Sequence, residues 1–109
     1  MYNHPEERHL TTKIDVLLKI ADILFFYKEG KADLSKTKRR LAFLKPIVKR
    51  KWPEEFEELY KEIDKAKEIL EKYDKEAYDK WIEYLKENHP EAIKKLEAET
   101  KSSLLAFFK

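Results

Sequence analysis

Cysteine is absent from this chain of 109 residues, glycine and methionine each occur once, and there are only four prolines. Without cysteine the protein has no disulfide framework and no thiol chemistry. Because glycine and proline most often punctuate turns, their scarcity predicts long helices with short connections, and therefore an all-α fold. The sequence also lacks an apolar run long enough to span a membrane and an N-terminal stretch resembling a signal peptide. We therefore expect a cytoplasmic helical domain without membrane contact.

Charged residues make up 42% of the chain and hydrophobic residues another 42%. This balance, dominated by lysine and glutamate, resembles that of proteins from hyperthermophiles, which carry dense surface ion pairs. The net charge of +2 conceals an uneven distribution. Residues 28–52 carry ten Lys or Arg against two acidic residues, whereas residues 53–109 carry eleven Lys against sixteen Asp or Glu. The basic segment therefore predicts an anionic partner.

The first predicted helix extends from about Pro5 to Glu29 and has two apolar stripes instead of one. The first stripe consists of Leu10, Ile14, Leu17, Ala21 and Leu24, and the second of Val16, Ile20, Ile23 and Tyr27. Two stripes indicate that this helix is the most buried element. The remaining face collects the polar residues Thr11, Asp15, Lys19 and Asp22. The only glycine, Gly30, follows the helix and predicts a left-handed C-cap.

Asp33 or Ser35 can cap a second helix. Its apolar seam consists of Leu34, Leu41, Leu44 and Val48. Pro46 lacks a backbone donor and clashes with the preceding turn, so the helix should kink there or stop and restart.

A third helix begins after Trp52 and Pro53. Its apolar residues alternate between spacings of three and four, as in a coiled-coil seam; they are Phe56, Leu59, Ile63, Ala66, Leu70, Tyr73 and Ala77. Either it continues to about Asn88 or, as we prefer, it breaks near Asp74, which can cap a fourth helix. The His89–Pro90 pair predicts another stop and restart. The sum is a small, single-domain bundle of four to five helices over residues 1–100, in which short connections make sequential neighbours antiparallel.

The basic segment is the first candidate site. Its proposed nucleic-acid contacts are Lys36, Lys38, Arg39, Arg40, Phe43, Lys49, Arg50, Lys51 and Trp52. Dense positive charge binds phosphates because it releases their condensed counterions, and Phe43 and Trp52 can stack on an unpaired base. The alternative is a solvated basic face with Phe43 packed in a second layer. No defined DNA-binding motif is present, so we expect any contact to tolerate sequence changes.

Nothing in the sequence nominates a catalytic residue, a metal site or a cofactor site. The only imidazoles are those of His4, His9 and His89, and their spacing does not place two of them on one helical face. There is no cysteine nucleophile, and no serine has a histidine near it in sequence. We therefore expect a protein that is not an enzyme.

The last residues, 101–109, contain a leucine followed three positions later by two phenylalanines. This pattern resembles the PIP box, the peptide by which replication and repair proteins dock on the sliding clamp PCNA, as in archaeal clamp partners. The resemblance implies that Lys101, Leu104, Phe107 and Phe108 contact the clamp. Lys101 stands where the family has glutamine, and a lysine cannot accept a hydrogen bond. Alternatively, residues 101–109 end the last helix, and the apolar residues of this segment belong to the core.

Two function classes follow from these patterns. The first is a non-enzymatic accessory protein of DNA replication or repair, in which a basic helical module is tethered to the sliding clamp or to a polymerase complex. The second is a structural or interaction bundle, such as a homo-oligomer of coat or nucleoid type, with the C-terminal aromatic residues in its own core. The exposure of Phe107 and Phe108 discriminates between the two.

Overall fold

The computed structural model describes the backbone of residues 9–108 and the side chains of residues 9–99. Within that range the chain is all-α and has no strand. The elements are α1 (Lys13–Lys28), α2 (Leu34–Lys51), α3 (Phe56–Tyr73), a short 3-10 turn η2 (Asp74–Glu76), α4 (Ala77–Asn88) and α5 (Pro90–Phe108). The predicted fold class is confirmed.

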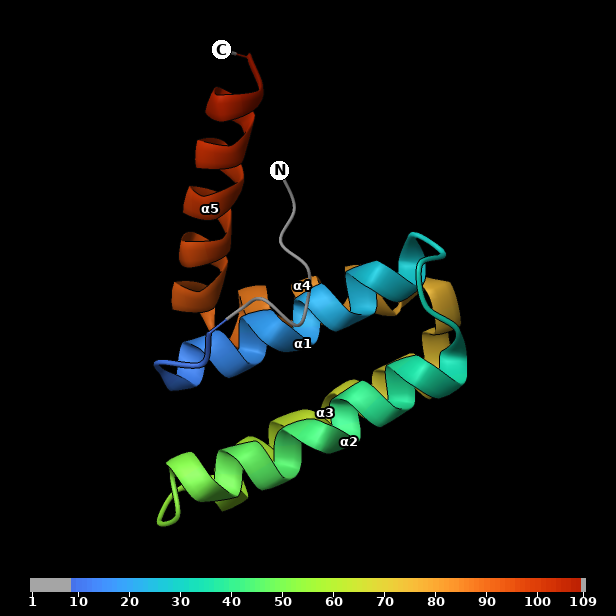
Figure 1. Cartoon of the computed structure of the whole chain (residues 1–109), viewed down its shortest axis with the longest axis vertical. Helices are drawn as coiled ribbons and strands as arrows, with labels where there is room; N and C mark the ends of the chain where they lie inside the picture. The colour runs from blue at the N-terminus through green and yellow to red at the C-terminus, as the bar shows by residue number, and fades with distance from the viewer. Residues whose placement is uncertain (1–8, 109) are drawn as a thin grey trace.

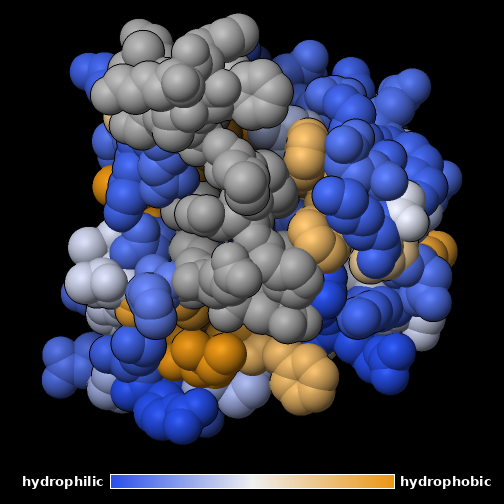
Figure 2. Space-filling view, turned by 45° about the horizontal axis from the view of Figure 1, so that its top comes forward, coloured by the Kyte–Doolittle hydropathy of each residue, from blue (hydrophilic) through white to orange (hydrophobic). Residues whose placement is uncertain are grey.

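Helices α1 to α4 form the bundle, and each is antiparallel to the next, as their short connections predict (Figure 1). Helix α5 turns away from them and projects beyond the bundle (Figure 1). Among the described side chains of this helix, residues 90–99, the buried ones are Ala92 and Ile93. In the view of Figure 2, hydrophilic side chains cover most of the coloured surface, and apolar ones show only in patches between them.

Helix α1 lies at the centre of the bundle, because it packs against α2, α3, α4 and α5. Both predicted stripes are buried except for Ile14, which is partly buried. Val16, Leu18 and Ile20 are completely inaccessible to solvent. The expectation that this helix is the most buried element is therefore confirmed.

The predicted start of the first helix is wrong. Residues 9–12 are not helical, and α1 begins at Lys13; the proposed first turn at Pro5 lies outside the described residues. The side chain of Asp15 explains the late start. Its Oδ2 atom accepts hydrogen bonds from the backbone amides of Thr11 and Thr12, at 2.9 and 2.8 Å. These bonds hold the preceding residues in an extended capping geometry.

The polar face of this helix does not lie on the surface. Asp15 and Asp22 are only 3% and 1% exposed, and Lys19 is half-buried. The reason is that α1 packs against α2, α3, α4 and α5, which cover the part of this face that carries Asp15 and Asp22. Buried carboxylates need compensating donors or cations, and for Asp15 the cation is Lys95 of α5.

The end of α1 and the start of α2 follow the sequence closely. Gly30 has a φ angle of +75°, as predicted for a left-handed cap, and its amide donates to the carbonyl of Tyr27 at 3.0 Å. The Oδ1 atom of Asp33 accepts a hydrogen bond from the amide of Lys36 at 2.7 Å and so caps α2. Leu34, however, is 38% exposed and is not part of the buried seam.

Helix α2 is continuous through Pro46, so the stop and restart, one of the two outcomes predicted at this proline, does not occur. Because the proline side chain is exposed and the buried residues Leu44 and Val48 flank it, packing on both sides holds the helix together despite the missing donor.

The preferred break near Asp74 is confirmed, because η2 separates α3 from α4. Asp74 is not the cap of the fourth helix, however; the N-cap of α4 is Glu76. Asp74 instead ends α3 with a φ angle of +50°, and its carboxylate accepts a hydrogen bond from the hydroxyl of Tyr27. Lys75 donates to the backbone carbonyl of Tyr27 at 2.8 Å. The second predicted break is also present, between Asn88 and Pro90.

The C-terminal segment is helical in its backbone as far as Phe108. The side chains of Lys101, Leu104, Phe107 and Phe108 lie outside the described residues. The division between a bundle over residues 1–100 and a docking peptide over residues 101–109 therefore stays a prediction.

Candidate nucleic-acid interface

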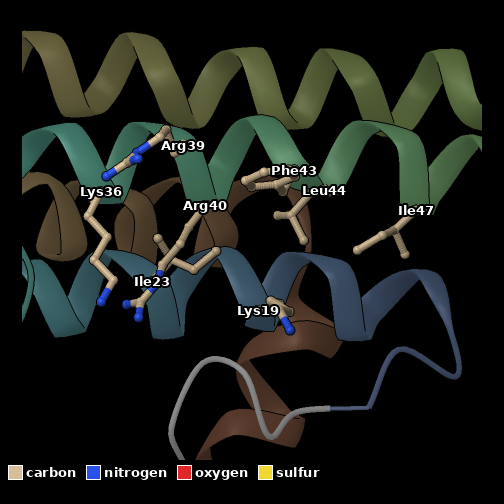
Figure 3. A pocket seen from close by; sticks show the side chains of 8 residues that line it. All are labelled: Lys19, Ile23, Lys36, Arg39, Arg40, Phe43, Leu44 and Ile47. Carbon is tan, nitrogen blue, oxygen red and sulfur yellow. The ribbon is translucent and has the colours of Figure 1, made fainter.

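A groove of about 410 Å³ lies between α1 and α2 (Figure 3). Its lining combines cations and apolar side chains: Lys19, Ile23, Lys36, Arg39, Arg40, Phe43, Leu44 and Ile47. No carboxylate is among these residues. Such a lining attracts anions, because the described residues that line the groove include four cations and no carboxylate.

Seven of the eight cations of α2 fall into two groups, those that contact a described residue of α3 and those that do not, and Arg40 is the eighth. On the side of α3, Lys45 pairs with Asp64 at 2.7 Å, and the ammonium of Lys49 lies 5.3 Å from the ring centroid of Phe56. The second group consists of Lys36, Lys38, Arg39, Arg50 and Lys51, whose side chains are exposed. Within residues 9–99, none of this second group has an ion-pair or cation–π partner. Their charge is therefore available to an external anion.

Phe43 is the most exposed large apolar residue in the described part of the chain. Its side chain is 67% exposed, which contradicts the alternative in which it packs in a second layer. The ring lies at the groove, one helical turn after Arg39 and one turn before Ile47. An exposed aromatic ring beside free cations is the arrangement that binds bases by stacking.

The other predicted aromatic contact, Trp52, has a different role. Trp52 follows the last residue of α2 as its C-cap, and its side chain is partly buried against the core. Trp52 does not line the groove, so its ring does not lie beside the cations of the groove.

Two groove residues carry interactions with the protein itself. The guanidinium of Arg40 lies 5.5 Å from the ring centroid of Phe26, and Arg40 is half-buried. Figure 3 shows Lys36 and Arg40 reaching from α2 toward α1, from which Lys19 comes. Arg40 and Lys19 therefore add to the positive electrostatic potential of the groove. Lys36 and Arg39 are exposed and can contact a ligand directly.

The structure brings together part of the predicted set. Lys36, Arg39, Arg40 and Phe43 meet at the groove. Lys51 lies at a neighbouring hollow of about 630 Å³, which it shares with Lys19 and Ile47, while Lys38, Lys49 and Arg50 line neither. Sequence reasoning missed the contribution of Lys19 and Ile23, because nothing in a linear pattern says which face of α1 meets α2.

A second polar cluster connects α3, α4 and the link to α5. The hydroxyl of Tyr84 donates to the Glu62 carboxylate at 2.8 Å, and the Nε2 atom of His89 lies 3.3 Å from Glu62 Oε1. Burial and this hydrogen bond raise the pKa of Tyr84 to about 12. A hydroxyl with that pKa stays protonated near neutral pH, so the cluster acts as a structural brace between helices.

Metal ligands do not converge anywhere in the described part of the chain. His89 lies beside Glu62 and Glu91, His9 is exposed at the other hollow, and His4 lies outside the described residues. The expectation that the protein has no metal site stays a prediction for the chain as a whole.

Comparison with known protein families, curated proteins and solved structures gives no match for this chain. None of the described helices is long and apolar enough to cross a membrane. The molecule is therefore defined by its all-α bundle and by the basic groove between α1 and α2.

Proposed function

We propose that the protein is a non-enzymatic, cytoplasmic accessory of DNA replication or repair. The helical bundle binds DNA through the basic face of α2, and the C-terminal end of α5 docks on a PCNA-type sliding clamp or a polymerase complex. The observation that carries the DNA contact is the combination of exposed cations such as Arg39 and Arg50, which have no ion-pair partner among the described residues, with a groove whose described lining includes no carboxylate.

The physical basis of the DNA contact is electrostatic. Each phosphate that a lysine or arginine neutralises releases condensed counterions, and this release supplies affinity irrespective of base sequence. The cations of α2 without an ion-pair or cation–π partner among the described residues start at Lys36 and end at Lys51, so they extend along most of that helix. The contact is therefore expected to tolerate sequence and to depend strongly on salt.

The direction of α5 supports the proposed clamp contact. Its first turns are fixed to the bundle by the ion pair of Lys95 with the buried Asp15, and its C-terminal part projects away from α1–α4 (Figure 1). A helix anchored in this way carries the backbone of residues 101–108 away from the bundle. Leu104, Phe107 and Phe108 supply the aliphatic and aromatic anchors that dominate many interfaces.

The proposed mechanism is tethering. When one end of a molecule binds DNA and the other binds the clamp that encircles DNA, the first contact raises the effective concentration for the second. Two contacts of modest affinity then give a stable complex without any chemical step, and no catalytic residue is required.

Charge reversal tests the DNA contact. The variant Arg39→Glu/Arg50→Glu removes two exposed cations of α2, and a matched control, Lys61→Glu/Lys86→Glu, makes the same change in net charge on α3 and α4. Fluorescence anisotropy with a labelled duplex should show a large loss of affinity for the first variant and a small loss for the control. Each lost phosphate contact should reduce the log–log salt slope by about 0.9. Equal losses in the two variants would show that the contact is not on α2.

Alanine substitution tests the clamp contact. The variant Phe107→Ala/Phe108→Ala should abolish binding to the cognate sliding clamp in a pull-down, with nearly the same melting temperature as the parent. Leu34→Ala, which removes an exposed apolar side chain from the start of α2, should keep clamp binding. If the double variant instead loses several degrees of melting temperature, the aromatic residues belong to a core or an oligomer interface, and the structural bundle is the better description.

A further inference from the structure

We propose that the groove between α1 and α2 holds an unpaired nucleotide, with the base stacked on Phe43 and its phosphates contacted by Lys36 and Arg39. The protein would then bind single-stranded nucleic acid more tightly than duplex. This inference rests on the proposed nucleic-acid contact of α2 and adds which form of nucleic acid the contact selects.

The exposure of Phe43 is the first argument. Its ring is 67% exposed although the chain buries every other phenylalanine of the described residues at least partly. A stacked base would cover this ring and remove apolar surface from water. Stacking is sequence-tolerant, because every base has a π-face.

The distribution of side chains along the groove is the second argument. Figure 3 shows Lys36, Arg39 and Arg40 at one end of the row on α2, Leu44 and Ile47 at the other, and Phe43 between them. A nucleotide has the same division into a charged phosphate part and a flat, less polar base. The volume of about 410 Å³ lies within the range of about 300–1,000 Å³ that small-ligand sites occupy.

The geometry of duplex DNA is the third argument. A duplex offers its phosphates to the cations of α2, but its bases are stacked on one another and have no free face for Phe43. Exposing a base face in a duplex requires unstacking, which costs a few kcal/mol. A single strand already offers such faces, so it can use both the cations and the ring.

The test compares strands of one sequence as single-stranded DNA, single-stranded RNA and duplex DNA, each spanning about 4–16 nucleotides. Fluorescence anisotropy at equal salt should show tighter binding of a single strand than of the duplex. Tighter binding of single-stranded RNA than of single-stranded DNA would identify RNA as the ligand and show that the protein contacts the 2′-hydroxyl. A preference for either single strand over the duplex supports an unpaired nucleotide in the groove.

Variants of Phe43 test the stacking contact with the full chain. Phe43→Ala should weaken single-strand binding about 5- to 150-fold and leave duplex binding unchanged. Phe43→Trp should keep the affinity, and the fluorescence of the new indole should be quenched by the single strand beyond the signal of the parent. Leu34→Ala serves as the matched control, because it removes the other large exposed apolar side chain of α2, which lies outside the groove.

The outcomes separate this inference from the proposed function. If Phe43→Ala changes neither binding, while Arg39→Glu/Arg50→Glu weakens both, the nucleic-acid contact stands and the stacking inference is overturned. Equal or tighter binding of the duplex by the parent overturns it as well. If the parent binds no nucleic acid at low salt, the nucleic-acid contact itself fails, and an acidic protein surface becomes the better partner for the groove.

Discussion

Replacing Asp15 by asparagine tests the contact that fixes the projecting helix α5 to the start of α1. Asp15 is 3% exposed and accepts hydrogen bonds from Lys95 and from the amides of Thr11 and Thr12. Burial alone would raise the pKa of Asp15, but the hydrogen bonds from Lys95, Thr12 and Thr11 outweigh burial and lower the pKa from 3.8 to about 2.

The size of the effect follows from this shift in pKa. A drop from 3.8 to about 2 corresponds to about 2 kcal/mol of unfolding free energy. Because the folded-state pKa lies below the unfolded value, this contribution is present above about pH 4 and is lost as the pH falls toward about 2. Asp15→Asn keeps the size of the side chain and one acceptor but removes the charge, so the variant should lose about 2 kcal/mol near neutral pH.

The assay is urea unfolding followed by circular dichroism, at several pH values between neutral and about pH 2. The difference in unfolding free energy between parent and Asp15→Asn should shrink as the pH falls through the window between the two pKa values. The matched control is Asp64→Asn, whose parent carboxylate is 57% exposed and pairs with Lys45; it should cost less than about 1 kcal/mol. A difference for Asp15→Asn that stays constant down to about pH 2 would refute the reasoning, because it would not come from the charge.

Three further predictions concern the stability of the bundle. Leu17 is 4% exposed, so Leu17→Ala should lower the unfolding free energy by about 2–5 kcal/mol in urea unfolding; a neutral effect would contradict its place in the core. Tyr27→Phe removes the hydrogen bond to Asp74 and should cost about 1.5–3 kcal/mol. That hydrogen bond and burial raise the pKa of Tyr27 from 10.0 to about 12, so the folded state favours the neutral hydroxyl. The loss of unfolding free energy in Tyr27→Phe should therefore be complete below about pH 10 and should disappear by about pH 12, as measured by urea unfolding across that pH range. Gly30→Ala places a Cβ at a φ of +75° and should cost about 1–2 kcal/mol; a higher melting temperature would show that the backbone there adapts.

Local rules predicted the helices well. Gly30 ends α1, Asp33 caps α2, the chain breaks between α3 and α4, and Pro90 begins α5. These features depend on the chain within a few residues, because capping, left-handed backbone and proline geometry act over one helical turn. The predicted start of α1 at Pro5 was wrong, and the signal for the correct start is equally local. The Thr12–Asp15 spacing is that of a capping box, and this signal would have placed the start of α1 correctly.

Packing between helices decided which polar residues of α1 are buried, because the helical period does not determine this. Periodicity says which residues share a face of one helix, but it does not say how many neighbours cover that helix. Asp15 and Asp22 were placed together on a polar face, yet both are buried because four helices surround α1. In the sequence, these two aspartates look the same as solvated carboxylates. For Asp15 the reason is that the compensating cation, Lys95, lies on α5, far away along the chain.

The same division holds for the candidate interface. The sequence determined that α2 is strongly basic and that Phe43 and Arg39 point away from its buried seam, because both properties follow from composition and from the period of a single helix. Only the tertiary structure decided that Lys36, Arg39 and Phe43 border a groove whose other wall is Lys19 and Ile23 of α1. It also decided that Lys45 and Lys49 contact α3 and that Arg40 lies against Phe26, whereas Lys36, Arg39 and Arg50 have no ion-pair or cation–π partner among the described residues. Which charges remain for a partner depends on the distances between helices, and the packing of the core sets those distances.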